Sequence, residues 1–293
     1  MVDVFLHYLQ HEKRYSPHTL TSYKNDLNAF AEYLRAVYSV EELHTANFPM
    51  IRSWMADLSD KDMSPKTIHR KMASLRSFFH YCRKKEIISS DPTLKIKTPK
   101  LPKRLPVFVE EQSMIKLLDQ VIFEENFEGK RDQMVLEILY GTGIRLSELI
   151  GLKESDIQIS KQTIKVTGKG NKQRIIPLNS AVIQCIQSYS DVKKREGIGN
   201  TNSFFIVTNN GEQSYPMFIY RLVRKYLDQV TTVEKRSPHV LRHTFATHLL
   251  NKGADLNAIK DLLGHSSLAA TQVYTHNTID KLKAIFEQAH PKS

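Results

Sequence analysis

A basic, proline-rich segment about one third of the way along the chain most constrains how this sequence can fold. Residues 97–106, KTPKLPKRLP, hold three prolines and four basic residues. Proline lacks a backbone N–H and fixes φ, so this composition resists helix and favours an extended, semi-rigid connection. The 293-residue chain also has the length of two domains at about 150 residues each. We therefore expect separate domains over residues 1–96 and 107–293, joined by a linker over 97–106.

The charge balance favours a polyanionic partner. Lys and Arg outnumber Asp and Glu by 42 to 31, which gives a formal net charge of +11 and a pI near 9.4. Such an excess favours nucleic acid first and an acidic membrane surface second. The two cysteines, Cys82 and Cys185, are too few and too far apart for a disulfide framework or a cysteine zinc site. With no export signal and no apolar run of about 18 residues, we expect a cytoplasmic protein without a membrane span.

Two segments of the first domain open in the same way. Ser16–Pro17 and Ser64–Pro65 each supply a helix cap and a proline at the first helical position, and an apolar stripe at three- and four-residue steps follows. No stretch before the linker has the pattern of a strand, so we expect a small helical bundle. The face of the second helix opposite its apolar stripe is cationic, which predicts DNA-phosphate contact or a merely solvated surface. Its basic residues are Lys66, Arg70, Arg76, Arg83 and Lys84.

The second domain mixes helices and short strands. Residues 131–143, RDQMVLEILYGTG, have the pattern of a buried helix ended by Gly141 and Gly143. Residues 162–178 alternate apolar and polar positions about a glycine-rich turn, which predicts a β-hairpin. The apolar run 203–207, SFFIV, is a candidate for one more short strand, although so short a run is ambiguous. The predicted fold class is mainly α with a small antiparallel β-sheet.

His239 and Arg242 lie one turn apart at the start of another Ser-Pro helix, SPHVLRHTFATHLL. Unpaired N–H groups and the helix dipole favour an anion there, and a guanidinium binds two phosphate oxygens. The competing interpretation is a capping histidine and a surface ion pair. A zinc site from His239 and His243 is a further alternative, but the pattern lacks the glutamate of H-E-x-x-H and an evident third ligand.

Two more cationic positions precede this helix. Arg145 stands at a helix start in GTGIRLSEL with Glu148 three residues later, so it is either a second phosphate-binding group oriented by a carboxylate or one half of an ordinary salt bridge. Lys169 lies between two glycines at the expected hairpin tip, where its ammonium could reach a ligand. The spacing of a nucleotide P-loop is absent.

The last motif is GHSSLAATQVYTH, residues 264–276. A helix from about Asp255 should stop at Gly264, and a new helix capped by Ser266 or Ser267 would place Tyr274 two turns in. Taken alone, Tyr274 is equally an ordinary half-buried helix residue.

In this order, the motifs resemble the tyrosine recombinase (phage integrase) family. The family pattern of Arg, Lys, His-x-x-Arg, Gly-His and Tyr is matched at every position, with Tyr274 nine residues after His265. The first domain, with SPHTLTSY and SPKTIHRKMASLRSFF, is similar to the family's helical core-binding domain. Size and layout are most like the Xer subgroup, and XerC-like more than XerD-like members. The six positions are Arg145, Lys169, His239, Arg242, His265 and Tyr274.

The resemblance implies a site-specific recombinase that cuts and rejoins DNA. Tyr274 would attack a scissile phosphate to give a 3′-phosphotyrosyl intermediate, Arg145 and Arg242 would bind its non-bridging oxygens, and Glu148 would orient Arg145. His239 would accept the tyrosine proton, Lys169 would protonate the leaving 5′-oxygen, and His265 would donate to the phosphate. No metal, cofactor or ATP is implied.

The resemblance also implies partners. These are double-stranded DNA with a specific site, a homo- or hetero-tetramer with a related recombinase, and a DNA translocase as an activator. Residues 277–293 would dock on a neighbouring protomer or fold back on their own domain. The role implied is resolution of chromosome dimers, with integration of a mobile element and topoisomerase IB-like relaxation as alternatives. A catalytically silent DNA-binding protein is a further alternative.

Overall fold

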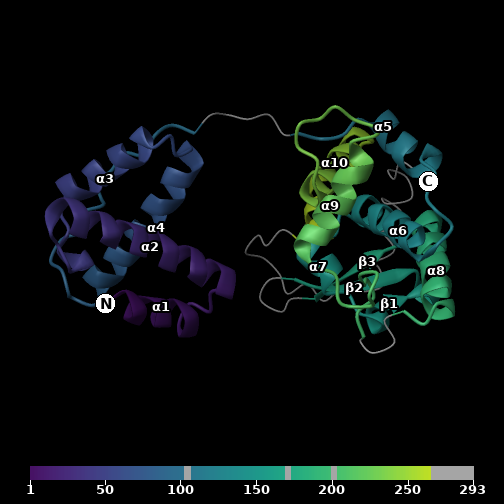
Figure 1. The fold of residues 1–293 in the computed structure, drawn as a ribbon, viewed down its shortest axis with the longest axis horizontal. Coiled ribbons are helices and arrows are strands. Elements are labelled where there is room, and N and C mark those ends of the chain that lie inside the picture. Colours follow the sequence, from purple (N-terminus) through teal and green to yellow (C-terminus); the bar gives the residue numbers. More distant parts are fainter. Residues whose placement is uncertain (102–106, 169–172, 199–202, 265–293) are drawn as a thin grey trace. The chain divides into compact units, whose positions relative to one another are not determined.

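The computed structural model describes residues 1–101, 107–168, 173–198 and 203–264. The chain divides into two compact units, Met1–Arg104 and Leu105–Ser293, each with a hydrophobic core of its own (Figure 1). No helix among the described residues is both long and apolar enough to span a membrane.

The described part of unit 1 is helical. Its elements are α1 (Val2–His11), α2 (Pro17–Tyr38), a short 3₁₀ turn (Leu43–Thr45), α3 (Phe48–Asp60) and α4 (Pro65–Lys84). The two Ser-Pro openings are confirmed as helix starts, because the hydroxyl of Ser16 accepts from the N–H of Thr19 and that of Ser64 accepts from the N–H of Thr67. These hydroxyls satisfy donors that the first turn of a helix leaves unpaired.

The core of unit 1 lies where α1, α2, α3 and α4 meet. It is rich in aromatic rings, with Phe30 against Trp54 at 4.8 Å between ring centroids and Phe78 against Phe79 at 5.4 Å. One carboxylate is completely buried in this apolar setting: Asp26 of α2 accepts hydrogen bonds from Arg70, Lys71 and Ser74 of α4. A buried charge needs such partners, so this group ties the two helices together.

Unit 2 combines a set of packed helices with a small sheet at one end of them (Figure 1). Its helices are α5 (Glu111–Ile115), continued by a π turn (Lys116–Gln120), α6 (Phe127–Thr142), α7 (Leu146–Ile150), α8 (Ser180–Arg195), α9 (Pro216–Leu227), α10 (Pro238–Asn251) and α11 (Leu256–Leu263). Its strands are β1 (Ile157–Gln158), β2 (Thr163–Thr167) and β3 (Gln173–Pro177), in antiparallel order β1-β2-β3. The predicted fold class, mainly α with a small antiparallel sheet, is confirmed.

Helix α6 is the centre of unit 2. Residues on all its sides are buried, as expected for a helix that other helices surround, and it packs against α8, α10 and α9. The predicted hairpin is also confirmed, since Ile164 pairs with Ile176 in the β2–β3 register.

Two local expectations need correction. The buried helix and its end at Gly143 are confirmed, with Gly143 at a φ of +58°, the left-handed conformation that closes many helices, but α6 continues through Gly141. Residues 203–207 are not a strand of the sheet. The side chains of residues 205–207 are buried and that of Phe204 is partly buried, but the strand pairing of this segment is limited to two isolated bridges, Lys153 with Phe204 and Val207 with Gln213.

Candidate active site

Arg145 occupies the cap position at the start of α7. Its backbone N–H donates to Oε2 of Glu148 at 2.8 Å, and its guanidinium Nη1 donates to Oε1 of the same carboxylate at 2.9 Å. Glu148 therefore closes the first turn of the helix and holds the arginine side chain at once. The Arg145 side chain stays 36% exposed, so part of its guanidinium can reach a ligand.

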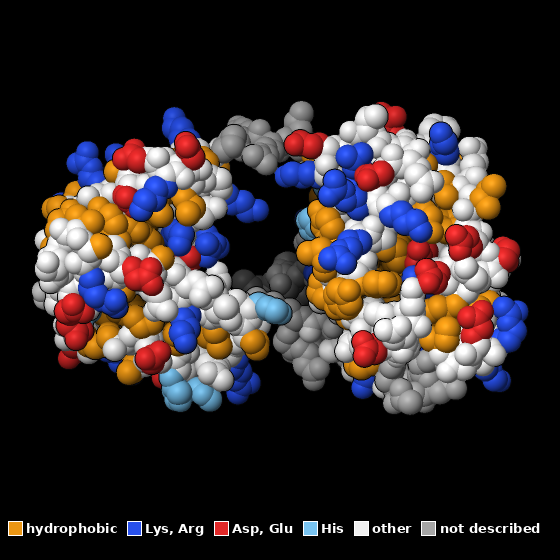
Figure 2. All heavy atoms as spheres, in the orientation of Figure 1, with side chains coloured by type: hydrophobic (Ala, Val, Ile, Leu, Met, Phe, Trp, Pro, Cys, Tyr) orange, Lys and Arg blue, Asp and Glu red, His pale blue; other side chains and the backbone are white. Residues whose placement is uncertain are grey.

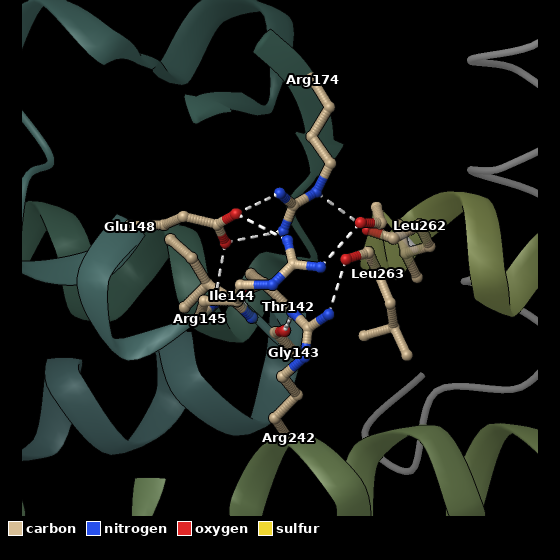
Figure 3. Close-up of polar contacts among 10 residues, drawn as sticks. Thr142, Gly143, Ile144, Arg145, Glu148, Arg174, Arg242, Leu262 and Leu263 are labelled. Atoms are coloured by element: carbon tan, nitrogen blue, oxygen red, sulfur yellow. Dashed lines mark hydrogen bonds and ion pairs between the residues drawn. The ribbon is translucent and has the colours of Figure 1, made fainter. Parts of the chain in front are cut away.

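A second arginine that the sequence analysis missed binds the same carboxylate. Arg174 of β3 donates from Nη1 to Glu148 Oε1 at 2.5 Å and from Nη2 to Oε2 at 2.9 Å, a bidentate pair (Figure 3). Its side chain is only 7% exposed. The signal in the sequence is strand alternation, because Arg174 shares a face with Ile176, which the hairpin pattern directs into the core.

Arg242 of α10 is buried, with 7% of its surface exposed. Its guanidinium donates to the carbonyl of Gly143 at the end of α6 and, at 2.6 Å, to the carbonyl of Leu263 at the end of α11. Burial, and then the nearby charges of Arg145 and Arg174, lower the pKa of Arg242 to about 10, which still leaves it cationic at neutral pH.

The C-terminal end of α11 joins these three arginines. Three consecutive carbonyls each accept one guanidinium N–H: Leu262 from Arg174 at 3.1 Å, Leu263 from Arg242 at 2.6 Å, and Gly264 from Arg145 at 2.7 Å (Figure 3). The last carbonyls of a helix lack partners within the helix and carry its negative dipole end. Cations from α7, β3 and α10 therefore converge on one helix terminus.

Glycine is required where the arginines meet the helix end. Gly264 has a φ of +62°, and a Cβ there would lie 3.2 Å from both Cδ and Nη1 of Arg174. A side chain at this position would be strained and would press on Arg174.

The local electrostatics favour an anionic ligand. Burial by itself would raise the pKa of Glu148, but hydrogen bonds from Arg174 and then from Arg145 lower it below the ordinary range, so the carboxylate is charged at neutral pH. The cluster thus contains three guanidiniums and one carboxylate, and its surplus of positive charge suits an oxyanion. Guanidiniums bind phosphate oxygens through charge-assisted hydrogen bonds.

The other predicted site residues are placed differently. His239 lies on the same helix as Arg242, but it is exposed. Lys169, His265 and Tyr274 lie outside the described residues, as do residues 277–293. For the zinc alternative at His239 and His243, no group of three or more His, Cys, Asp or Glu side chains suited to a metal occurs in the part of the chain that the structure describes.

The five basic residues predicted on the cationic face of α4 differ in their surroundings. Lys66, Arg83 and Lys84 are exposed. Arg70 is held by Asp26 at 2.5 Å and Ser22 at 2.9 Å, and Arg76 donates to the carbonyl of Ile96 at 2.8 Å. Figure 2 shows Lys and Arg side chains distributed over the visible surface of unit 1 among acidic ones.

Comparisons with known proteins match both units. Residues 108–281 match the Phage integrase family, and residues 2–86 match the phage integrase N-terminal SAM-like domain. The chain is 38% identical to the tyrosine recombinase XerC of Chlorobaculum parvum, over 99% of this chain and 94% of that protein. It is 37% identical to the XerC of Listeria innocua, over 99% of this chain and 97% of that protein.

Solved structures share the fold. The XerH site-specific recombinase bound to palindromic difH substrate superposes with a TM-score of 0.73 at 20% identity, covering 97% of this chain and 83% of that one. The Tn1549 transposon integrase in complex with transposon right end DNA gives 0.71 at 22% identity, covering 98% of each chain. At these identities the likeness concerns the fold alone.

Proposed function

The chain belongs to the phage integrase family, the tyrosine recombinases, and from this premise we propose that its physiological reaction is the resolution of chromosome dimers. As a tyrosine recombinase it is an enzyme that cuts and rejoins DNA at specific sites. The observation that carries the proposed role is similarity to XerC proteins over nearly the full length of both chains. The convergence of Arg145, Glu148 and Arg242 supports an intact phosphate-binding site.

We propose that Tyr274 is the nucleophile. Its phenolic oxygen forms a bond to the scissile phosphorus while the bond to the 5′-oxygen breaks, which leaves a 3′-phosphotyrosyl ester and a free 5′-hydroxyl. A 5′-hydroxyl of the partner duplex then reverses the step. One phosphodiester is exchanged for a similar ester, so no ATP is needed.

The arginines supply the charge stabilisation in this proposal. A phenol with a pKa near 10 is a weak nucleophile at neutral pH, so the site must remove its proton and stabilise the developing negative charge. Arg145 and Arg242 bind the non-bridging oxygens, and their hydrogen bonds to Glu148 and to the ends of α6 and α11 hold them ready. His239 accepts the tyrosine proton, Lys169 protonates the leaving 5′-oxygen, and His265 donates to the phosphate.

We propose further that residues 1–96 and 107–293 are a DNA-binding and a catalytic domain, with 97–106 as the linker. The basic face of α4 contacts DNA phosphates through Lys66, Arg70, Arg76, Arg83 and Lys84. Hydrogen bonds within unit 1 hold Arg70 and Arg76 in place.

Lys66→Gln should then reduce the slope of log DNA affinity against log salt concentration by about one in magnitude.

The proposed assembly is a homo- or hetero-tetramer in the cytoplasm, on two DNA sites, activated by a DNA translocase. Residues 277–293 dock on a neighbouring protomer.

A covalent trap tests the chemistry. The protein is incubated in EDTA, without ATP, with duplexes that carry a candidate site nicked beside the scissile phosphate, and an SDS-stable protein–DNA band is looked for. We expect the band for the wild type and none for Tyr274→Phe, with equal DNA binding by both. Identical profiles, or a requirement for a metal ion, would exclude this mechanism.

The physiological role needs a separate test. Chromosome dimers arise from homologous recombination between sister chromosomes, so loss of this protein should give unsegregated nucleoids that disappear when homologous recombination is also disabled. Normal segregation in the deletion strain would favour the integrase of a mobile element. Relaxation of supercoiled DNA without a specific site would favour the topoisomerase alternative.

A further inference from the structure

Arg174 is the one guanidinium of the cluster that the proposed mechanism does not use. It is more buried than Arg145, with 7% of its side chain exposed against 36%. All three of its contacts are internal, two to the Glu148 carboxylate and one to the carbonyl of Leu262. A side chain in this position is suited to act through other residues.

We propose that Arg174 is a positioning residue for strand cleavage, which fixes Glu148 and the end of α11 and through both of them orients Arg145 toward the scissile phosphate. The inference rests on the proposed function of the site.

The Glu148 carboxylate links Arg174 to Arg145 through both of its oxygens. Each Glu148 oxygen bridges the two arginines: Oε1 accepts from Nη1 of Arg174 and Nη1 of Arg145, while Oε2 accepts from Nη2 of Arg174 and the backbone N–H of Arg145. The bidentate pair with Arg174 allows the carboxylate plane one orientation. That orientation sets both the side chain and the backbone of Arg145.

The C-terminal end of α11 links the same two arginines a second time. Arg174 Nε holds the carbonyl of Leu262 at 3.1 Å, and its Cδ and Nη1 would lie 3.2 Å from a Cβ at Gly264. The carbonyl of Gly264 in turn accepts from Nη2 of Arg145 at 2.7 Å. Arg174 therefore fixes both acceptors of the Arg145 guanidinium, the carboxylate on one side and the helix end on the other (Figure 3).

The planar, forked shape of the Arg174 guanidinium is required for these contacts. A lysine at position 174 would keep the positive charge but could not make two parallel bonds to Glu148 and a third to Leu262 from one planar group. The proposal therefore predicts that charge alone does not replace Arg174.

The test measures the rate of covalent adduct formation on a nicked duplex with protein in excess. We expect Arg174→Gln to slow this step about 100-fold and Arg174→Lys about 10-fold, with DNA affinity within about 3-fold of wild type. Arg195→Gln, at an exposed position with 69% of the side chain accessible, is the matched control and should react at the wild-type rate. Should Arg174→Gln fail to fold, Arg174→Lys carries the same test.

Two readouts separate positioning from a general loss of structure. In a Glu148→Gln background, Arg174→Lys should have a smaller further effect than its about 10-fold effect in the wild type, because one of the two groups through which it acts is already lost. On a duplex with a methylphosphonate at the scissile position, which carries less charge for Arg145 to stabilise, the defect of Arg174→Lys should shrink several-fold.

Each outcome decides the inference. Wild-type rates in both Arg174 variants, multiplicative effects with Glu148→Gln, or an unchanged defect on methylphosphonate DNA would overturn it. If the wild type itself forms no adduct, the proposed function fails, and the inference fails with it. If the wild type reacts and only the Arg174 predictions fail, the function stands without the inference.

Discussion

Among the described residues, each unit has a buried carboxylate that pairs with two cations, Asp26 in unit 1 and Glu148 in unit 2, but the two groups are built differently. In unit 1, Asp26 holds Arg70 and Lys71 between two packed helices, and Lys71 also lies 5.6 Å from the Trp54 ring centroid. In unit 2, Glu148 holds Arg145 and Arg174, which also donate to carbonyls at the C-terminal end of α11.

The difference indicates two uses of the same interaction. The cations around Asp26 come from one helix, α4, so the group serves mainly to join α4 to α2. The two arginines on Glu148 come from the start of α7 and from β3, and Arg242 of α10 adds a third guanidinium at the same helix end, so positive charge exceeds negative charge in this cluster. The first group stabilises a fold, and the second leaves a surplus of positive charge that suits an anion.

Removal of Arg242 should have the largest effect on the reaction. Arg242→Ala deletes a donor held ready for the phosphate, and the rate of adduct formation should fall about 100-fold or more, as observed when one preorganised donor is lost in other enzymes. Single-turnover kinetics on the nicked duplex measure this. Arg195→Ala is the control, and a wild-type rate for Arg242→Ala would remove the distinction between the two groups.

The paired substitutions Asp26→Asn and Glu148→Gln compare the two carboxylates directly. Asp26→Asn leaves Lys71 buried without its counter-charge, and we expect a loss of about 3 kcal/mol in the stability of unit 1 but a cleavage rate at saturating protein within about 3-fold of wild type. Glu148→Gln should lower that rate about 10-fold. Calorimetry and single-turnover kinetics on both variants give the two numbers. An equal loss of rate in both would show that the groups do not differ in use.

Gly143, which ends α6, and Gly253 form a matched pair of positive-φ glycines that tests the packing around the site. Gly143 has a φ of +58°, and a Cβ there would lie 2.5 Å from Phe245 Cδ1 and 2.8 Å from Leu263 Cδ2, whereas Gly253, with a φ of +86°, has nothing within 4 Å of its Cβ position. Gly253→Ala should cost about 1 kcal/mol from backbone strain, and Gly143→Ala about 2 kcal/mol more from overpacking. Chemical unfolding measures the difference, and equal losses would contradict the packing around Gly143.

The smallest predicted effect concerns acid stability. Burial raises the pKa of Glu148, but the hydrogen bonds from Arg174 and Arg145 outweigh it, so the folded-state pKa is below the ordinary value of 4.5. The charged carboxylate therefore stabilises the fold above pH 4.5, and this contribution is lost as the pH falls through the folded-state pKa. Unfolding free energies measured from pH 7 downward should decline less steeply in Glu148→Gln than in the wild type. Parallel curves would contradict this sign.

Local rules account for much of the fold. Ser16, Ser64 and Ser237 each precede a proline and each cap a helix as predicted, because capping depends on residues three positions apart. The hairpin also follows from its alternating pattern. The candidate strand at residues 203–207 does not form, because a short apolar run indicates burial without specifying a strand.

The site was harder to predict, for a physical reason. Arg145 with Glu148 is a local pair, visible at a spacing of three residues. Arg174 reaches Glu148 from 26 residues away and Leu262 from 88, so only the folded chain brings them together. The convergence on the last carbonyls of α11 involves backbone atoms, for which no residue type gives a signal.

In the proposed mechanism, the arginine cluster and Tyr274 act on one phosphodiester. The most direct measurement is to digest the trapped protein–DNA adduct with protease and nuclease and to identify the modified peptide by mass spectrometry. We predict a nucleotide joined through its 3′-phosphate to the phenolic oxygen of Tyr274. Attachment to any other residue, or a linkage to the 5′-phosphate, would contradict the account.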